Sequence, residues 1–341
     1  MDLSDVVLTV NGVNLSAFQV LISLLCLALL PFLFKKEKTS GDTDGGGDIS
    51  MGLRREMAYS SSQSLSSMAS TSANTAAADS RVIHPTQFKQ FKVIKRKQES
   101  HNTVQITMAI PGNNELGLKI GRHVSVKADI AGNKVIRAYT PVSQIDQKGK
   151  FDILVKRYDD GKLSNYIWNL KEGDWLDVRG PVGRYQWEKN AYPVMGLIAA
   201  GSGITPCLQL IRSTLESPVA KGDTTKFILY YQNRTEEDIL MREVLELLAA
   251  KHPDRLKVVF FLSKMQGSRW NDGKAGHATM QAVPQGKVGF SGGYIDPTWI
   301  SEMHYNVCPY VAICGPSGFN GTMKDLLCDH GHDADTSVFQ F

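Results

Sequence analysis

A segment of mixed basic, aromatic and hydroxyl residues, RAYTPVS at positions 137–143, follows a β-rich run of the chain. The guanidinium of Arg137 could bind a pyrophosphate through two parallel hydrogen bonds. The ring of Tyr139 could lie flat on another ring, and the hydroxyls of Thr140 and Ser143 could donate to ring or ribose oxygens. By itself, such a segment is more often a plain turn with a surface arginine.

The second segment begins at Lys156-Arg157-Tyr158 and continues as Gly161-Lys162-Leu163-Ser164 before a helix expected over residues 165–170. A glycine, backbone N–H groups and a hydroxyl at a helix start suit an anion. The alternative, a plain N-cap at Ser164 with Lys162 in solvent, would be preferred if the segment stood alone.

Two further segments each combine glycine with a strand-to-helix turn. Residues 199–206, AAGSGITP, leave an apolar strand, and a proline stands in the first turn of the helix that follows. Glycines there let the backbone approach a pyrophosphate. Residues 313–319, ICGPSGF, would bring the Cys314 thiol to a similar turn, although the usual role of such a cysteine is to be buried and structural.

Two patterns of periodicity indicate the domains that must position these segments. Short β-rich runs separated by Gly, Asp and Asn predict an antiparallel barrel over residues 81–190, with strands at 91–95, 102–109, 123–129, 133–139, 151–158 and 175–179. After that, strands alternate with helices, which predicts a parallel α/β domain over residues 191–341. Its expected strands are 194–200, 226–231, 256–261 and 310–314, and its expected helices are 206–216, 235–251 and 318–330.

An uncharged apolar run over residues 16–34 is long enough to span a membrane as one helix. It follows a short leader, residues 1–15, that contains Asp2 and Asp5, and it precedes Lys35, Lys36 and Lys38, so the C-terminal side is expected in the cytosol. A cleaved signal peptide is the alternative, although the leader lacks the basic residues that such a peptide needs. Residues 35–80 are rich in Gly, Ser and Ala and are expected to form a flexible linker.

The composition argues against a nucleic-acid-binding protein and against a metal-binding protein. A net charge of +4, with basic residues spread along the chain, argues against nucleic acid as a partner. The five cysteines have neither disulfide-framework nor metal-ligand spacing, so no metal site is expected.

The four segments in this order, RxYTxxS, KxY with GKxS, GSGITP and CGPxGF, resemble the ferredoxin-reductase-like flavoproteins, and most of all the NADH–cytochrome b5 reductase family. The resemblance runs from His84 to Phe341 and includes QNRTEEDIL at residues 232–240. It implies that the barrel binds FAD, that the second domain binds NADH, and that electrons pass to cytochrome b5 or a similar heme protein. With the anchor expected over residues 16–34, the catalytic domains are expected in the cytosol, at the endoplasmic reticulum or the outer mitochondrial membrane.

The resemblance assigns a role to each matching position. The residues expected at the reacting rings are Thr140, Lys156, Thr205 and Cys314. The other cofactor-binding residues are expected to be Arg137, Ala138, Tyr139, Ser143, Val155, Tyr158, Gly161, Lys162, Leu163, Ser164, Gly201, Gly203, Pro206, Ser263, Gly315 and Pro316.

One position departs from the family pattern. Family members that use NADH usually carry an aspartate after the leucine of the third nucleotide-domain strand, where this chain has Ser263 and Lys264. A carboxylate there accepts a hydrogen bond from the ribose 2′-hydroxyl and repels a 2′-phosphate. Ser263 and Lys264, helped by Arg234, could accept that phosphate, so NADPH is also a possible donor.

Two alternatives remain open from the sequence. The same flavoprotein could serve another acceptor, such as a quinone or a nitrate-reductase-type partner. A membrane-tethered scaffold without catalysis would need a broken cofactor motif, and none is found.

Overall fold

The structure is a computed structural model that describes residues 7–10, 13–16, 81–264 and 288–341. The chain divides into two compact units, residues 1–73 and 74–341. In the first unit, β1 (Val7–Val10) and β2 (Val13–Ser16) form an antiparallel pair. No helix in the described ranges is long and apolar enough to cross a membrane. Apart from Ser16, the predicted anchor and linker, residues 16–80, lie outside the described residues.

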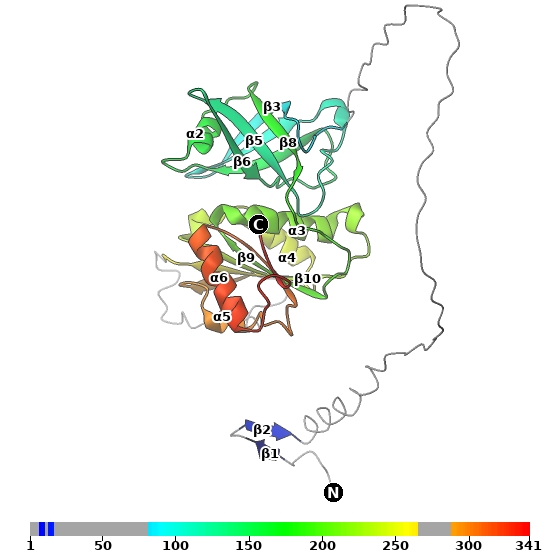
Figure 1. The fold of residues 1–341 in the computed structure, drawn as a ribbon, viewed down its shortest axis with the longest axis vertical. Helices are drawn as coiled ribbons and strands as arrows, with labels where there is room; N and C mark the ends of the chain where they lie inside the picture. The colour runs from blue at the N-terminus through cyan, green and yellow to red at the C-terminus, as the bar shows by residue number, and fades with distance from the viewer. Residues whose placement is uncertain (1–6, 11–12, 17–80, 265–287) are drawn as a thin grey trace, which may run out of the picture. The chain divides into compact units, whose positions relative to one another are not determined.

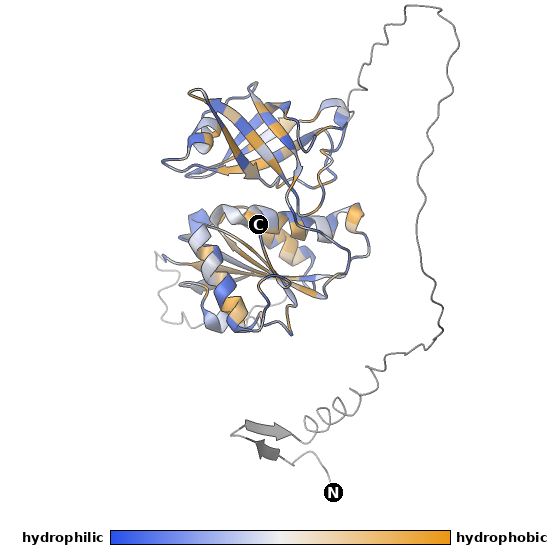
Figure 2. Ribbon diagram, viewed as in Figure 1, coloured by the Kyte–Doolittle hydropathy of each residue, from blue (hydrophilic) through white to orange (hydrophobic). Residues whose placement is uncertain are grey.

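The first lobe of the second unit is a six-stranded antiparallel sheet in the order β6-β5-β8-β3-β4-β7 (Figure 1). Apolar and polar residues alternate along these strands (Figure 2), so one face of the sheet forms the core. The edge strands β6 and β7 also contact each other, which curls the sheet toward a barrel. The strands are β3 (Lys89–Ser100), β4 (Thr103–Ala109), β5 (His123–Ile130), β6 (Asn133–Tyr139), β7 (Lys150–Lys156) and β8 (Trp175–Val182), with helix α2 (Lys162–Trp168) after β7.

The second lobe is a six-stranded parallel sheet in the order β12-β11-β10-β9-β13-β14. Its strands are β9 (Val194–Ala200), β10 (Lys226–Asn233), β11 (Leu256–Leu262), β12 (Val288–Gly292), β13 (Tyr310–Cys314) and β14 (Val338–Gln340). Core clusters lie on both faces of the sheet, one under α3 (Ile204–Glu216) and α4 (Arg242–Lys251), the other under α5 (Pro297–Ser301) and α6 (Ser317–Asp329). Because both faces are covered, the predicted strands β9, β10, β11 and β13 are mainly apolar and buried.

Several element boundaries differ from the prediction. Helix α2 begins at Lys162 rather than at residue 165. Helix α4 begins at Arg242 because Thr235 to Asp238 forms a separate capped turn, in which the Asp238 carboxylate accepts hydrogen bonds from the backbone N–H and the hydroxyl of Thr235. The short elements β12, α5 and β14 were not predicted.

Helix α3 joins the two lobes. The side chain of Gln209 accepts a hydrogen bond from the Gly121 N–H at 2.8 Å and donates one to the Arg122 carbonyl at 3.0 Å. Arg212 donates from Nη1 to the Val142 carbonyl at 2.7 Å. These bonds hold α3 against the barrel lobe, so its first turn, which carries Thr205, lies at the boundary between the lobes (Figure 1).

Candidate functional site

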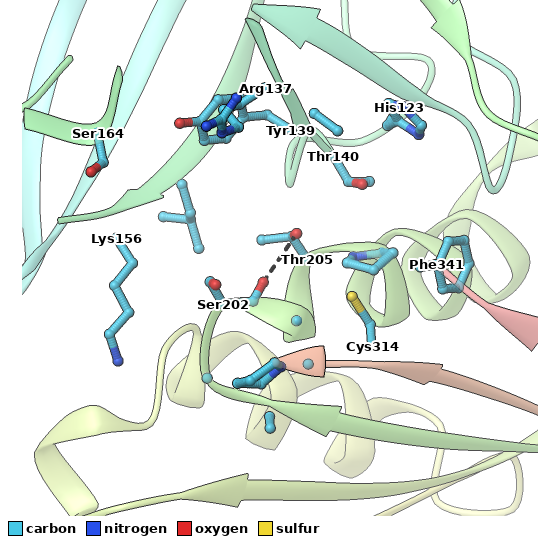
Figure 3. Close-up of a pocket in the computed structure, with 18 of the residues that line it drawn as sticks. His123, Arg137, Tyr139, Thr140, Lys156, Ser164, Ser202, Thr205, Cys314 and Phe341 are labelled. Atoms are coloured by element: carbon cyan, nitrogen blue, oxygen red, sulfur yellow. Dashed lines mark hydrogen bonds between the residues drawn. The ribbon is translucent and has the colours of Figure 1, made fainter. Parts of the chain in front are cut away.

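A pocket of about 1350 Å³ lies between the lobes and is lined by residues of both. In Figure 3, Arg137, Tyr139 and Thr140 of the barrel lobe lie on one side, and Thr205, Ser202 and Cys314 of the parallel-sheet lobe lie on the other. The parallel strands contribute their carboxyl ends, and the pocket lies beside the switch in strand order between β9 and β13. This is the edge of an α/β sheet where ligands usually bind.

The edge strand β6 supplies the aromatic and cationic groups of the barrel wall. Tyr139, the last residue of β6, lines the pocket, and burial raises its pKa to about 12 although the nearby Arg137 acts in the opposite direction. The phenol is therefore neutral near pH 7. Arg137 is exposed, lines the pocket and donates from Nη1 to its own neighbour, the Ile136 carbonyl, at 2.8 Å.

The loop before α2 depends on a glycine. A Cβ at Gly161 would lie 2.2 Å from the Ser164 Oγ, so only glycine fits there without a shift. Gly161 is the residue that caps α2, and Ser164 lies inside the helix, where its hydroxyl donates to the Gly161 carbonyl at 3.1 Å and accepts from the Tyr158 N–H at 3.4 Å. The sequence alternative, Ser164 as the N-cap, is therefore wrong. The hydroxyl instead fixes the loop that lines the pocket.

The two glycine turns of the parallel-sheet lobe lie against each other. A Cβ at Gly203 would lie 2.0 Å from the Cys314 carbonyl oxygen, which is backbone and cannot move away independently. A Cβ at Gly315 would lie 2.6 Å from the Phe319 ring. The absence of these Cβ atoms therefore lets the turns after β9 and β13 pack together, and both line the pocket.

Residues from both lobes meet at the first turn of α3. Thr205 Oγ1 donates to the Ser202 carbonyl at 3.3 Å (Figure 3). The hydroxyls of Ser202 and Tyr158 lie 3.3 Å apart, so the barrel lobe contacts this turn directly. The ammonium of Lys156 lies 3.9 Å from the position that a Cβ of Gly201 would take. A ligand in this part of the pocket would contact both lobes.

Burial shifts the pKa of two groups that line the pocket, the Cys314 thiol and the His123 imidazole. Burial raises the pKa of the Cys314 thiol to about 12, so the thiol stays protonated. Burial and the neighbouring Arg122 lower the pKa of His123 below its ordinary value, which favours the neutral imidazole. A protonated thiol and an imidazole shifted toward its neutral form suit a site that binds and orients a ligand.

All the site residues expected from the sequence line this pocket except two. Ser143 is buried outside it, and its hydroxyl accepts a hydrogen bond from the Asp152 N–H at 3.1 Å. The Val155 side chain is packed in the barrel core. The structure thus brings together expected site residues that are up to 179 positions apart in the chain, from Arg137 to Pro316 (316 − 137 = 179).

Sequence reasoning missed an aromatic group in the lining. Tyr185 stacks on Phe341 with ring centroids 5.5 Å apart and an interplanar angle of 28°, and Phe339 meets Tyr185 edge-on at 5.0 Å. Asn233 and Tyr294 also line the pocket without having been assigned to it. Asn233 ends the central strand β10, so the rule that ligands bind at carboxyl ends could have identified it. Nothing in the local sequence indicates Tyr185.

Two protein families match successive parts of the chain. The family described as the Oxidoreductase FAD-binding domain matches residues 90–187, and the family described as the Oxidoreductase NAD-binding domain matches residues 197–325. These ranges coincide with the antiparallel and parallel lobes, so the division that periodicity predicted is also a division between two known domain families.

Two curated relatives that share one name are similar to this chain. NADH-cytochrome b5 reductase 1 of Meyerozyma guilliermondii is 37% identical over 247 residues, which are 71% of this chain and 79% of that protein. The protein of the same name from Mycosarcoma maydis is 40% identical over 203 residues, which are 59% of this chain and 61% of that protein.

Solved structures show the same fold. The cytochrome b5 reductase domain of Ulva prolifera nitrate reductase superposes with a TM-score of 0.65 at 25% identity, over 76% of this chain and 99% of that one. The CS-b5R domains of human Ncb5or in the NAD+ form superpose with a TM-score of 0.60 at 26% identity, over 74% of this chain and 69% of that one.

Proposed function

The chain belongs to the NADH-cytochrome b5 reductase family, and from this premise we propose that it oxidises NADH, reduces FAD and passes single electrons to cytochrome b5 or a similar heme protein. The observation that carries the proposal is that residues of both lobes line one pocket of about 1350 Å³. A hydride can pass between two bound cofactors only if their rings meet. A pocket that reaches from Tyr139 to Cys314 gives both rings one place to meet.

The residues present fit FAD on the barrel side. Arg137 supplies a planar cation for a pyrophosphate, Tyr139 a neutral ring for a flat partner, and the loop at Gly161 a backbone without side-chain obstruction. When bound, FAD supplies the redox chemistry, taking two electrons from the nicotinamide and releasing them singly. The protein itself positions the two cofactors, and Thr140, Lys156 and Thr205 would orient the reacting rings.

The residues of the parallel-sheet lobe fit a nicotinamide nucleotide. The turns at Gly203 and Gly315, which pack against each other, line the pocket together with the protonated Cys314 thiol, and the nicotinamide would lie beside them. At the other end of the same sheet edge, Ser263 and Arg234 line the pocket, and the Lys264 N–H donates to the Arg234 carbonyl at 2.7 Å. No carboxylate stands at position 263 to reject a 2′-phosphate, which supports NADPH as a second donor.

The test is steady-state reduction of ferricyanide and of cytochrome b5 by the full chain, with NADH and NADPH in parallel. The proposal expects both acceptors to be reduced with NADH, and with NADPH at lower efficiency. Ferricyanide reduction without cytochrome b5 reduction would assign the chain a different physiological acceptor. A colourless protein that reduces neither would contradict the proposal.

We also propose that residues 16–34 anchor the protein to the endoplasmic reticulum or the outer mitochondrial membrane, with the two lobes in the cytosol. The support is the uncharged apolar run and the lysines that follow it. Expression of residues 81–341 should then give a yellow, active protein that no longer partitions with membranes, while the full chain does. A full chain that remains in the aqueous fraction would contradict the anchor.

A further inference from the structure

Two apolar side chains are exposed on the outer face of the antiparallel sheet, where β3 and β8 run side by side (Figure 1). Along β3, Phe91 and Val93 are buried in the core, so Lys92 and Ile94 lie on the opposite, outer face. Trp175, the first residue of β8, pairs with Lys92 and shares that face. Trp175 is 53% exposed and Ile94 is 42% exposed, so this surface, the β3–β8 face, has apolar area to bury against a partner.

Cations surround this apolar pair. β3 carries four lysines and one arginine among its twelve residues, and its one carboxylate, Glu99, pairs with Lys97 at 3.4 Å. Lys92 and Lys95 are exposed, and neither forms an ion pair with a carboxylate of the described residues. These two lysines are therefore available to an anionic partner.

The loop before Trp175 brings two carboxylates to the edge of the β3–β8 face. Glu172 accepts a hydrogen bond from the Arg96 N–H at 3.3 Å, and Asp174 accepts one from the Lys171 N–H at 2.7 Å. Over β3 and residues 171–175 the chain has six cations and three carboxylates. The face is thus net positive, which suits an anionic surface.

The position of the face argues against the electron acceptor as its partner. An acceptor has to approach the flavin expected in the cofactor pocket, and Lys92, Lys95 and Trp175 are not among the residues that line it. The outer face of the sheet is instead the one on which the chain enters the barrel lobe. The ring of Phe88, directly before β3, lies 4.6 Å from the Lys127 ammonium and 5.0 Å from the Arg179 guanidinium of the neighbouring strands.

The chain before this point contains the predicted anchor and linker. As a flexible chain, the linker predicted over residues 35–80 would span roughly 35 to 40 Å on average. A tether of that length keeps the effective concentration of the membrane surface high, so a face that binds weakly on its own would still be docked. Tryptophan is enriched at membrane–water interfaces, and anionic headgroups attract lysine.

From these observations we propose that the β3–β8 face docks on the anionic phospholipid headgroups of the membrane that holds the anchor, with Trp175 at the level of the headgroups. The inference rests on the proposed anchor over residues 16–34. Docking fixes which side of the barrel lobe faces the membrane.

The test uses the full chain reconstituted in phosphatidylcholine vesicles with and without about 30% phosphatidylserine, in which brominated lipid quenches nearby tryptophan. All five tryptophans lie within residues 168–299, so quenching reports the two lobes while flotation with the vesicles reports the anchor. We expect quenching in the anionic vesicles, little in phosphatidylcholine alone, and loss of most of it in Trp175→Phe.

A charge change at the face gives a second readout. Lys92→Glu/Lys95→Glu should weaken docking about twentyfold or more, because one lysine near an anionic surface contributes roughly fivefold. Lys226→Glu/Lys257→Glu makes the same change of charge at exposed positions of the parallel-sheet lobe and should leave quenching unchanged. Melting temperatures show whether each variant is folded.

The outcomes separate this docking from the anchor. A chain that floats with the vesicles, and whose quenching is the same in Trp175→Phe as in the wild type, would overturn the docking alone, whereas a chain that does not float would overturn both. An equal loss of quenching in the two lysine variants would attribute the effect to net charge and overturn the assignment to this face. Loss of quenching on addition of soluble cytochrome b5 would assign the face to an acidic protein instead of the membrane.

Discussion

At the scale of single residues, two arginines that line the cofactor pocket belong to different lobes, Arg137 to the barrel and Arg234 to the parallel-sheet lobe. Substitution of each arginine should therefore weaken the binding of a different cofactor. Arg137→Ala should weaken FAD retention roughly tenfold or more, because a charge-assisted hydrogen bond to phosphate contributes about 1.5 to 3 kcal/mol. Arg234→Ala should retain FAD and weaken the coenzyme instead.

The measurement is flavin content after dialysis, read from the absorbance ratio of flavin to protein, together with the KM for NADH and NADPH. Each variant serves as the control for the other. Full flavin content in Arg137→Ala would remove that residue from the FAD site, and a loss of flavin in Arg234→Ala would mean that the lobes do not divide the cofactors as assigned.

Ser263 allows a second prediction at this scale. It is partly exposed, follows β11 and lines the pocket beside Arg234. Ser263→Asp would place a carboxylate next to any 2′-phosphate, and like charges in a partly buried site repel strongly. We expect the KM for NADPH to rise about tenfold or more while kcat changes little, because the contact is remote from the reacting carbon and binds the ground and transition states equally.

The natural control for this change is Ser263→Asn, which has the size of aspartate without its charge and should leave the coenzyme ratio near that of the wild type. A wild-type protein that already excludes NADPH, with no further change in Ser263→Asp, would show that other residues select the coenzyme.

At the scale of elements, the contact between the turns after β9 and β13 is the feature most sensitive to substitution. Gly203→Ala would place a methyl group 2.0 Å from the Cys314 carbonyl oxygen, so the two turns would have to separate. We expect weaker NADH binding and a lower melting temperature. Gly318→Ala is the matched control: a Cβ there meets nothing within 4 Å, and alanine is the better helix former at the start of α6.

Melting curves and NADH titrations of both variants test this account of the turns. A Gly203→Ala protein as stable as Gly318→Ala, with unchanged affinity for NADH, would mean that the close approach of the two turns has no importance for the site.

The loop between α6 and β14 is attached through a buried histidine. His332 Nε2 donates to the Met303 carbonyl at 2.8 Å, and burial, chiefly, lowers the pKa of this imidazole below its ordinary value of 6.5. A folded-state pKa below the unfolded one means that the unfolded chain binds the proton more readily. The neutral His332 therefore contributes its full share to the free energy of unfolding above pH 6.5. This contribution is lost as the pH falls through the folded-state pKa of His332.

Thermal unfolding at pH 7.5 and at pH 5.5 tests this linkage. The difference in melting temperature between the two pH values should be smaller in His332→Gln than in the wild type, because the variant lacks the titrating group. An equal difference in the two proteins would show that His332 contributes nothing to the acid lability.

These elements also show how far the sequence predicts the fold. Strands β10 and β11 are eight and seven residues long and mainly apolar, so their pattern identifies them. The elements β12, α5 and β14 contain only five, five and three residues, too few to show a period. The start of α4 was misplaced because a capping carboxylate, Asp238, makes a separate turn within an otherwise helical pattern.

At the scale of the whole molecule, the sequence predicts the two lobes but not their contact. The change of periodicity near residue 190 separates an antiparallel from a parallel sheet, and both were found. The hydrogen bonds of Gln209 join it to Gly121, 88 residues away, and to Arg122, 87 residues away. A local sequence pattern cannot predict contacts over such separations. The position of Tyr185 is likewise not visible in the local sequence. A Cβ at Gly121 would lie 2.1 Å from the Tyr185 ring, so the ring fits there only because residue 121 is glycine.

The central claim is that the two lobes bring FAD and NADH together in one pocket, and anaerobic titration of the purified yellow protein with NADH tests it most directly. The account predicts that the flavin absorbance band is bleached by about one equivalent of NADH and returns when ferric cytochrome b5 is added. A flavin band that stays unchanged through an excess of NADH would contradict the account.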